Sequence, residues 1–253
     1  MELELWQFAV LFAAAFFGGF IDSIAGGGGL ISLPALLAVG VPPHVAIATN
    51  RFQGSFGSFT AALNFIRKGY VDAAEILRGV IFTFVGGLVG AYVLLLIDAK
   101  FLNYLIPILL LALLFYMIFS PNLGEAPAKP KMSKKSFYAI FGLVLGFYDG
   151  FFGPGTGSFW TFALVGILGL YMKKAVAHTK VLNFTSNIVS LGVFIIGGQI
   201  LWLVGAVMAV GQIAGSFAGS SLVMRCDVKF VRKMLLFVVA ATILKLLYGL
   251  IAN

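Results

Sequence analysis

Residues 21–32 of the chain read IDSIAGGGGLIS. This stretch places one carboxylate, Asp22, and four consecutive glycines, Gly26–Gly29, inside an otherwise apolar run. Glycine in the interior of a helix is destabilising, so a continuous membrane helix is not expected to contain four in a row. The stretch therefore predicts a turn between two helices.

The composition indicates a membrane protein. Of the 253 residues, 61% are hydrophobic and only 10% are charged, whereas soluble domains are about 25% charged. The net charge of +8 lies mostly in short loops, which the positive-inside rule explains without nucleic acid as a partner. The acidic start Met1–Leu5 lacks the basic region of a signal peptide, so the first apolar segment is expected to stay in the mature protein. The single cysteine, Cys226, excludes an intrachain disulfide and a CxxC metal site.

Apolar segments of spanning length predict an all-α polytopic membrane protein. These segments are 6–23, 44–66, 74–97, 101–119, 137–152, 174–197, 200–224 and 229–251. Two further segments, 30–41 and 157–170, are shorter. At about 1.5 Å per residue a helix over 30–41 reaches only about 18 Å, against a hydrocarbon core of roughly 30 Å. We therefore expect two helical hairpins, 6–41 and 137–170, which either re-enter or cross fully.

Two parts of the chain resemble each other at a nearly constant offset. Gly19–Asp22 matches Gly146–Asp149 at an offset of 127, and Ala46–Arg51 matches Ala175–Lys180 at an offset of 129. Each repeat is then a glycine-tipped hairpin followed by three transmembrane helices. Because three is an odd number of crossings, the second repeat enters the membrane from the opposite side. Such an inverted repeat is typical of secondary transporters, whose substrate site lies near the midplane where broken helices meet.

The repeats divide the chain into three parts. The first repeat is 1–119, a cytoplasmic linker is 120–136, and the second repeat is 137–253. Small residues spaced four apart, as in helix-packing surfaces, also recur at an offset of 125. These residues are Gly86 and Gly90 in the first repeat and Gly211 and Gly215 in the second.

Basic residues predict the orientation in the membrane. The clusters are Arg67, Lys68 and Arg78; Lys129, Lys131, Lys134 and Lys135; Lys173 and Lys174; and Arg225, Lys229, Arg232 and Lys233. The loops near 42–44, 98–100 and 198–200 carry few charges. Since cytoplasmic loops are enriched in Lys and Arg, we expect both termini on the outer side of the cytoplasmic membrane.

Five ionisable residues fall within spanning segments: Asp22, Arg51, Asp149, Lys180 and Lys245. Each costs about 2.5–3.5 kcal/mol on insertion scales, so each should face a partner or a cavity. Asp22 and Asp149 are repeat-related, as are Arg51 and Lys180. Two interpretations remain open: the cations bind a substrate, or aspartate–cation pairs fix the hairpins to neighbouring helices. We interpret Asp22 together with Arg51, whereas Lys245 is expected to extend toward the membrane surface.

Both glycine tips are candidate anion sites. A glycine run that opens a helix exposes unpaired N–H groups at the positive end of the helix dipole. The alternative is that glycine only permits a tight turn. A phosphate loop is excluded because no Gly-Lys-Ser/Thr follows the run. The candidate substrate contacts are Gly26, Gly27, Gly28, Gly29, Asn50, Arg51, Gly153, Gly155, Thr156, Ser158, Thr179, Lys180 and Asn183; candidates for charge pairing or proton coupling are Asp22, Asp149 and His178.

The motifs resemble the TauE/SafE sulfite exporter family, also called the 4-toluene sulfonate uptake permease family, over nearly the whole chain. The resemblance rests on Gly19-Phe20 leading into Gly26–Ile31, Pro34, the run Gly40-Val41-Pro42-Pro43-His44-Val45-Ala46, and the second copy from Gly146. It is closest to bacterial inner-membrane members that carry GFIDSIAGGGG and GFYDGFFGP. The resemblance implies transport of small sulfur-containing anions such as sulfite, thiosulfate, sulfoacetate or other sulfonates.

Together these features predict a secondary transporter for a small sulfur-containing anion, with proton coupling as one option. An anion or water channel and an intramembrane enzyme or assembly factor remain as alternatives. The chain shows no nucleophile–base set and no HExxH, so an enzyme is not expected, and neither a metal nor a cofactor is. The expected partners are the anion and membrane lipids, and a homo-oligomer is compatible with the sequence.

Overall fold

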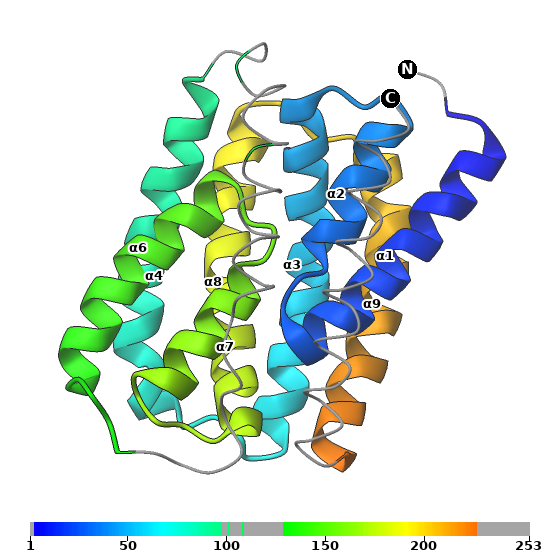
Figure 1. Ribbon diagram of the computed structural model, residues 1–253. Helices are drawn as coiled ribbons and strands as arrows, with labels where there is room; N and C mark the ends of the chain where they lie inside the picture. The colour runs from blue at the N-terminus through cyan, green and yellow to red at the C-terminus, as the bar shows by residue number, and fades with distance from the viewer. Residues whose placement is uncertain (1–2, 98–100, 102–107, 109–128, 227–253) are drawn as a thin grey trace.

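The computed structural model describes residues 3–97, 101, 108 and 129–226, and this part of the chain is all-helical (Figure 1). Its helices are α1 (Leu5–Ala25), α2 (Gly29–Ala38), α3 (Pro43–Arg67), α4 (Ala73–Leu95), α6 (Lys134–Phe151), α7 (Thr156–Gly166), α8 (Met172–Ile196) and α9 (Trp202–Arg225). The predicted segments 101–119 and 229–251, with Lys245, lie outside the described residues apart from Phe101 and Ile108.

Both glycine runs break the helix as predicted. Gly26 follows α1 with a φ of +72°, and Gly153 and Gly155 precede α7 with φ values of +93° and +81°. These are backbone conformations that glycine adopts readily and other residues rarely do. The short second helix of each hairpin ends early: α2 stops at Ala38 and α7 at Gly166, before the predicted ends at 41 and 170.

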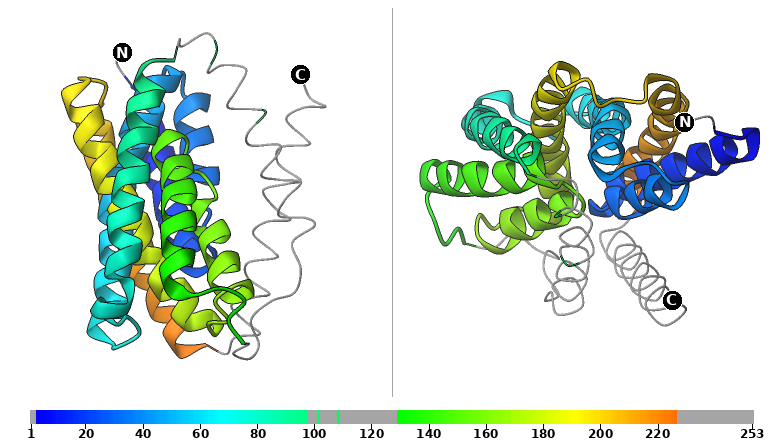
Figure 2. Two further views of the ribbon diagram at one scale, coloured as in Figure 1. Left: turned by 90° about the vertical axis from the view of Figure 1, so that its left-hand side faces the viewer. Right: turned by 90° about the horizontal axis from the view of Figure 1, so that it is seen from above.

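The helices form two groups around a central pair. Viewed from above, α3 and α8 lie side by side, with α1, α2 and α9 on one side and α4, α6 and α7 on the other (Figure 2). The most extensive packing is between α1 and α9 and between α4 and α6. In Figure 1, α1 descends from the N-terminal end of the bundle whereas α6 ascends toward it. Each hairpin therefore packs on a helix that belongs to the other predicted repeat.

Glycine makes these two contacts close. A Cβ added at Gly215 would lie 2.0 Å from the carbonyl oxygen of Phe16 in α1, and one at Gly90 would lie 2.1 Å from that of Phe147 in α6. Neither position has room for any other side chain. The predicted packing surfaces are thus the α1–α9 and α4–α6 crossings.

Length and composition make four of the described helices candidate membrane spans: α1, α4, α8 and α9. The helix α3 has 25 residues but is less apolar, because polar side chains such as Thr49, Gln53 and Ser58 lie along it and are buried inside the protein. Large apolar side chains point outward instead, as expected for surfaces that face lipid, among them Trp6, Phe17, Tyr92, Leu203 and Phe217.

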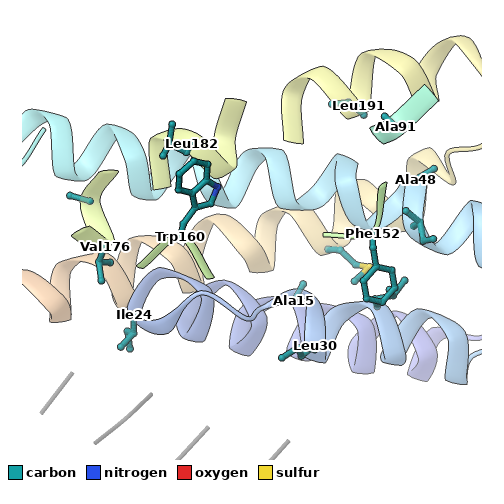
Figure 3. Packing of buried hydrophobic residues seen from close by; sticks show 14 of the residues in the cluster. Ala15, Ile24, Leu30, Ala48, Ala91, Phe152, Trp160, Val176, Leu182 and Leu191 are labelled. Atoms are coloured by element: carbon teal, nitrogen blue, oxygen red, sulfur yellow. The ribbon is translucent and has the colours of Figure 1, made fainter. Parts of the chain in front are cut away.

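Apolar side chains from both hairpins fill the interior around the glycine tips. Ile24 and Leu30 of the first hairpin belong to the same buried cluster as Phe152 and Trp160 of the second (Figure 3). Trp160 is fully buried. This packing holds the two tips against the central helices.

Basic residues gather at one end of the bundle. Apart from Arg51 and Lys180 in the interior, the described ones lie at or near the C-terminal ends of α3 and α9 and the N-terminal ends of α4, α6 and α8, all at the end opposite the start of α1 (Figure 1). They are Arg67, Lys68, Arg78, Lys129, Lys131, Lys134, Lys135, Lys173, Lys174 and Arg225.

Candidate functional site

Two ion pairs, one buried and one partly buried, join the hairpins to the central helices, and they cross between the predicted repeats. Arg51 Nη1 lies 2.7 Å from Asp149 Oδ1, and Lys180 Nζ lies 2.8 Å from Asp22 Oδ2. The interpretation of Asp22 together with Arg51 is therefore wrong. Each hairpin packs across the bundle, so its carboxylate meets the cation of the other repeat rather than its own.

Both cations occupy equivalent places on their helices. Arg51 is the ninth residue of α3 and Lys180 the ninth of α8, and both helices have 25 residues. At 1.5 Å per residue each cation is about 12 Å from the start of its helix. Because α3 and α8 run in opposite directions (Figure 1), the two cations are displaced toward opposite ends of the bundle.

The first tip binds a carboxylate that the chain itself supplies. The backbone N–H groups of Gly27 and Gly28 donate to Asp22 Oδ1, at 3.1 and 3.3 Å. The sequence predicts substrate contacts at these two amides, whereas in the structure the Asp22 carboxylate, which precedes them on α1, accepts from both. Asp22 is thus held by two amides and by Lys180, which also donates to the Asp22 carbonyl oxygen.

At the second tip, backbone glycine lies directly against a guanidinium group. A Cβ added at Gly153 would be 2.2 Å from Arg51 Nη2 and 2.5 Å from Cζ. The Thr156 hydroxyl, a predicted substrate contact, instead donates to the Gly153 carbonyl oxygen at 2.7 Å. Tyr148 donates to the Pro154 carbonyl oxygen at 2.9 Å. These bonds fix the turn that carries Gly153 to Arg51.

The two tips touch each other. A Cβ added at Gly26 would lie 2.2 Å from the carbonyl carbon of Gly157, and one at Gly157 would lie 2.6 Å from the Cα of Gly26. The Ser158 hydroxyl donates to the Gly26 carbonyl oxygen. Only glycine permits this close backbone contact between the two tips.

A polar cavity of about 40 Å³ lies where the tips and the central helices meet. Since one water needs about 10–15 Å³ on this measure, the cavity has room for about three waters or a small solute. Its lining includes these predicted site residues: Asp22, Gly29, Asn50, Arg51, Asp149, Gly153, Gly155 and Asn183. It does not include Gly26, Gly27, Gly28, Thr156, Ser158, Thr179, Lys180 or His178.

Arg51 faces this cavity with spare hydrogen-bond donors. The residue is only 3% exposed. Its Nη1 donates to Asp149 and, at 3.0 Å, to Asn187, whereas Nε and Nη2 have no hydrogen-bond partner among the described residues. Leaving charged donors unpaired in a buried site is costly. The guanidinium can therefore offer N–H groups from two of its nitrogens to an anion in the cavity.

The Asp149 carboxylate is held by side chains from both central helices. Besides Arg51, it accepts a hydrogen bond from the Ser186 hydroxyl, which comes from α8. Its carboxylate neutralises the charge of Arg51 and holds the guanidinium in one orientation. An anion that binds Arg51 must therefore use the donors that Asp149 leaves free.

Three predicted residues lie elsewhere in the bundle. Lys180 is fully buried in its pair with Asp22, Thr179 shares a hydrogen bond of 3.1 Å with Thr161, and His178 Nδ1 lies 3.1 Å from the Tyr138 hydroxyl. The part of the chain that the structure describes contains no group of three or more His, Cys, Asp or Glu residues that could hold a metal ion.

The cavity also has lining residues that the sequence did not single out. They are Ser32, Gln53, Gly54, Pro154, Gly157, Asn187 and Gln212. Gln53 and Asn187 were visible in the sequence as polar neighbours of Arg51 and Lys180. Gln212 had a weaker signal, a single amide side chain between the packing glycines Gly211 and Gly215 of α9.

Comparison with known proteins places this architecture in a family. The model of the family described as "Sulfite exporter TauE/SafE" matches residues 11–246. A probable membrane transporter protein of Haemophilus influenzae is 42% identical over 252 residues, covering 98% of this chain and 97% of the relative. The probable membrane transporter protein YfcA of Escherichia coli K12 is 44% identical over 239 residues, covering 94% and 89%.

A third relative agrees with these two. The probable membrane transporter protein ORF9 of a Sinorhizobium species is 40% identical over 246 residues, covering 97% of this chain and 94% of the relative. No solved structure matches the chain. The chain is a multi-pass membrane transporter and belongs to the sulfite exporter TauE/SafE family.

Proposed function

We propose that the protein is a secondary transporter that carries a small sulfur-containing oxyanion across the cytoplasmic membrane. One observation carries this proposal: the Arg51 guanidinium is buried at the junction of the two hairpin tips, it lines a polar cavity, and its Nε and Nη2 have no hydrogen-bond partner among the described residues. A planar fork of N–H donors suits an oxyanion with two oxygens in range. The family's name as a sulfite exporter supports sulfur oxyanions as the substrate class.

The crossed ion pairs suggest how access could alternate. In transporters with inverted repeats, one repeat rocks against the other around a site near the midplane. Here Arg51–Asp149 and Lys180–Asp22 both connect the predicted repeats, so any rocking motion must shift both pairs. Arg51 serves the state described here, and Lys180, displaced toward the opposite end, serves the other state.

Proton coupling is the second part of the proposal. Asp22 and Asp149 lie beside the tips and line the cavity, so protonation of either would release its cation to the substrate. Asp22→Asn and Asp149→Asn mimic the protonated forms. If both variants kept the pH dependence of uptake seen in the wild-type protein, coupling through these carboxylates would be refuted.

We also propose that the basic end of the bundle faces the cytoplasm and both termini face outward, since positive residues favour the cytoplasmic side. The single cysteine, Cys226, follows α9 at the basic end and serves as a natural probe. A membrane-impermeant thiol reagent should leave Cys226 unlabelled in intact cells and label it after permeabilisation. The control, Cys226→Ser combined with Glu4→Cys, should be labelled in intact cells; the reverse pattern would invert the topology.

Uptake into proteoliposomes tests the transport proposal. We expect uptake of radiolabelled sulfite or thiosulfate to saturate with concentration and to depend on an imposed gradient. Arg51→Lys keeps the charge but loses the planar fork, and should lower the rate at low substrate concentration by at least about tenfold. A flux that rises linearly with concentration would indicate a channel and overturn the proposal.

A further inference from the structure

The cavity presents unpaired acceptors as well as donors. Gln53 Oε1, Asn183 Oδ1 and Gln212 Oε1 have no hydrogen-bond partner among the described residues, although the three residues are only 1%, 5% and 4% exposed. All three residues line the same cavity as Arg51. Buried polar atoms are nearly always hydrogen-bonded, so three unpaired carbonyl oxygens on residues around one small cavity require a hydrogen-bond donor there, either water or a donor group of the ligand that displaces it.

The neighbouring contacts hold two of these side chains in place. Gln53 Nε2 donates to Asn50 Oδ1 at 2.7 Å, which directs its own carbonyl oxygen away from Asn50. Gln212 inserts from α9 against α3, where a Cβ added at Gly57 would lie 2.3 Å from Gln212 Cγ. The absence of a side chain at Gly57 is what admits the glutamine, so its position is built into the helix crossing.

Gln212 belongs to the second repeat, and the first repeat has no glutamine at the corresponding position. At the offset of 125 its counterpart in the first repeat is Gly87, and at the offset of 129 the counterpart of Gly57 is Ser186. A Cβ added at Gly87 would lie 3.3 Å from the Cα of Ser186. The first-repeat crossing thus has glycine where the second has Gln212, and α4 contributes no amide to the cavity lining opposite Gln212.

The charges around the cavity limit the ligand further. Arg51 is paired with Asp149 and Asp22 with Lys180, so the four charges sum to zero. Each additional negative charge on a ligand is therefore uncompensated by the protein. In a low-dielectric interior this disfavours a dianion more than a monoanion.

We propose that the cavity selects a monoanionic oxyanion that itself carries a hydrogen-bond donor, such as a hydrogen oxyanion or an amino- or hydroxyl-bearing sulfonate. This inference rests on the proposed function and specifies its substrate class. Arg51 binds the anionic oxygens, and the amide oxygens of Gln53, Asn183 and Gln212 accept from the donor group. A ligand without a donor leaves these oxygens buried and unpaired, which weakens its binding.

Sulfamate and methanesulfonate provide the sharpest test. Both are sulfonate-type monoanions of nearly the same shape, and they differ in an amino group against a methyl group. Isothermal titration of the purified protein should show sulfamate binding at least about tenfold more tightly than methanesulfonate. Sulfate, a dianion without a donor, should bind more weakly than sulfamate by a similar or larger factor.

Gln212→Met tests whether the Gln212 side chain accepts the hydrogen bond from the donor group of the ligand. Methionine keeps an unbranched chain beside Gly57 but removes the carbonyl, so the ratio of the sulfamate to the methanesulfonate affinity should fall severalfold. Gln199→Met is the matched control, because Gln199 Oε1 is also buried without a partner among the described residues but lies outside the cavity. This control should leave the ratio unchanged.

The outcomes separate the inference from the function on which it rests. Equal affinities for sulfamate and methanesulfonate in the wild-type protein would overturn the inference while leaving an anion transporter intact. If neither of these anions nor sulfite, thiosulfate or sulfate bound, the proposed function itself would fail. The wild-type comparison requires no variant, so it holds even if Gln212→Met does not fold.

Discussion

The two ion pairs of the bundle are related by the repeat but differ in what they leave unused. Around Lys180–Asp22, the cation donates to the Asp22 carboxylate and carbonyl, and the carboxylate also caps the amides of Gly27 and Gly28. Around Arg51–Asp149, one guanidinium nitrogen donates to two partners, while Nε and Nη2 have no partner among the described residues. We call Lys180–Asp22 the closed pair, because its cation donates only to Asp22. We call Arg51–Asp149 the open pair, because its cation has donors without a partner among the described residues.

This difference has a chemical origin in two substitutions between the repeats. An ammonium group has three N–H donors, which one carboxylate and a nearby carbonyl can accept. A guanidinium has five N–H donors in a fixed planar arrangement, so one carboxylate leaves some of them unpaired. The second tip also carries Pro154, which has no N–H, where the first tip has glycine amides that bind Asp22. In the proposed transporter, the open pair binds the anion in one access state.

The largest effect should come from breaking the open pair. Arg51→Met leaves Asp149 charged and almost fully buried, and should lower the free energy of unfolding by about 3–5 kcal/mol. Lys180→Met should cost less, about 1–3 kcal/mol, because the Asp22 side chain is 19% exposed and keeps its two amide donors. Chemical unfolding in detergent, followed by tryptophan fluorescence, measures both.

The double variant Arg51→Met with Asp149→Asn provides the control for this comparison. Neutralising the unpaired carboxylate should restore most of the lost stability without restoring anion binding. A loss for Lys180→Met as large as that for Arg51→Met would contradict the distinction between an open and a closed pair.

A smaller effect should follow from separating the tips. Gly26→Ala places a Cβ 2.2 Å from the Gly157 backbone at a φ of +72°, so strain and overpacking together should cost roughly 2–4 kcal/mol. Gly40→Ala is a matched control, because Gly40 has a φ of +85° with no atom within 4 Å of the added Cβ. Its cost should be about 1–2 kcal/mol in the same unfolding measurement. Equal losses would show that the tips do not need to touch.

The smallest effect should come from the hydroxyl that supports the open pair. Ser186→Ala removes the hydrogen bond to Asp149 Oδ2 and should cost about 1.5–3 kcal/mol, since the acceptor is charged. Ser190, one turn later, is equally buried but donates only to the carbonyl of Ser186 within α8, so Ser190→Ala should cost about 0.5–1.5 kcal/mol. Thermal unfolding of the two variants should rank them in that order, and the reverse order would argue against a supporting role for Ser186.

The sequence predicted the helices and the hairpin breaks well, because both depend on local signals. Apolar runs of spanning length and glycine clusters fixed α1 to α4 and α6 to α9 to within a few residues. The same local reasoning identified Asp22, Arg51, Asp149 and Lys180, since ionisable residues in apolar segments are rare and costly.

The partner of each charged residue and the number of unpaired donors on Arg51 could not be predicted in the same way. Which carboxylate meets which cation depends on how the hairpins cross the bundle, and no local pattern encodes that crossing. The capping of Gly27 and Gly28 by Asp22 depends on a turn of one specific shape. Gln212 lines the cavity only because Gly57 on another helix leaves room for it.

The most direct test of the central claim is a crystal structure of the protein with selenite, whose selenium locates the anion by anomalous scattering. We expect a selenium peak in the cavity, with selenite oxygens within hydrogen-bonding distance of Arg51 Nε and Nη2. A peak at the amides of Gly27 and Gly28 with Asp22 displaced, or peaks only at the basic end of the bundle, would contradict this claim.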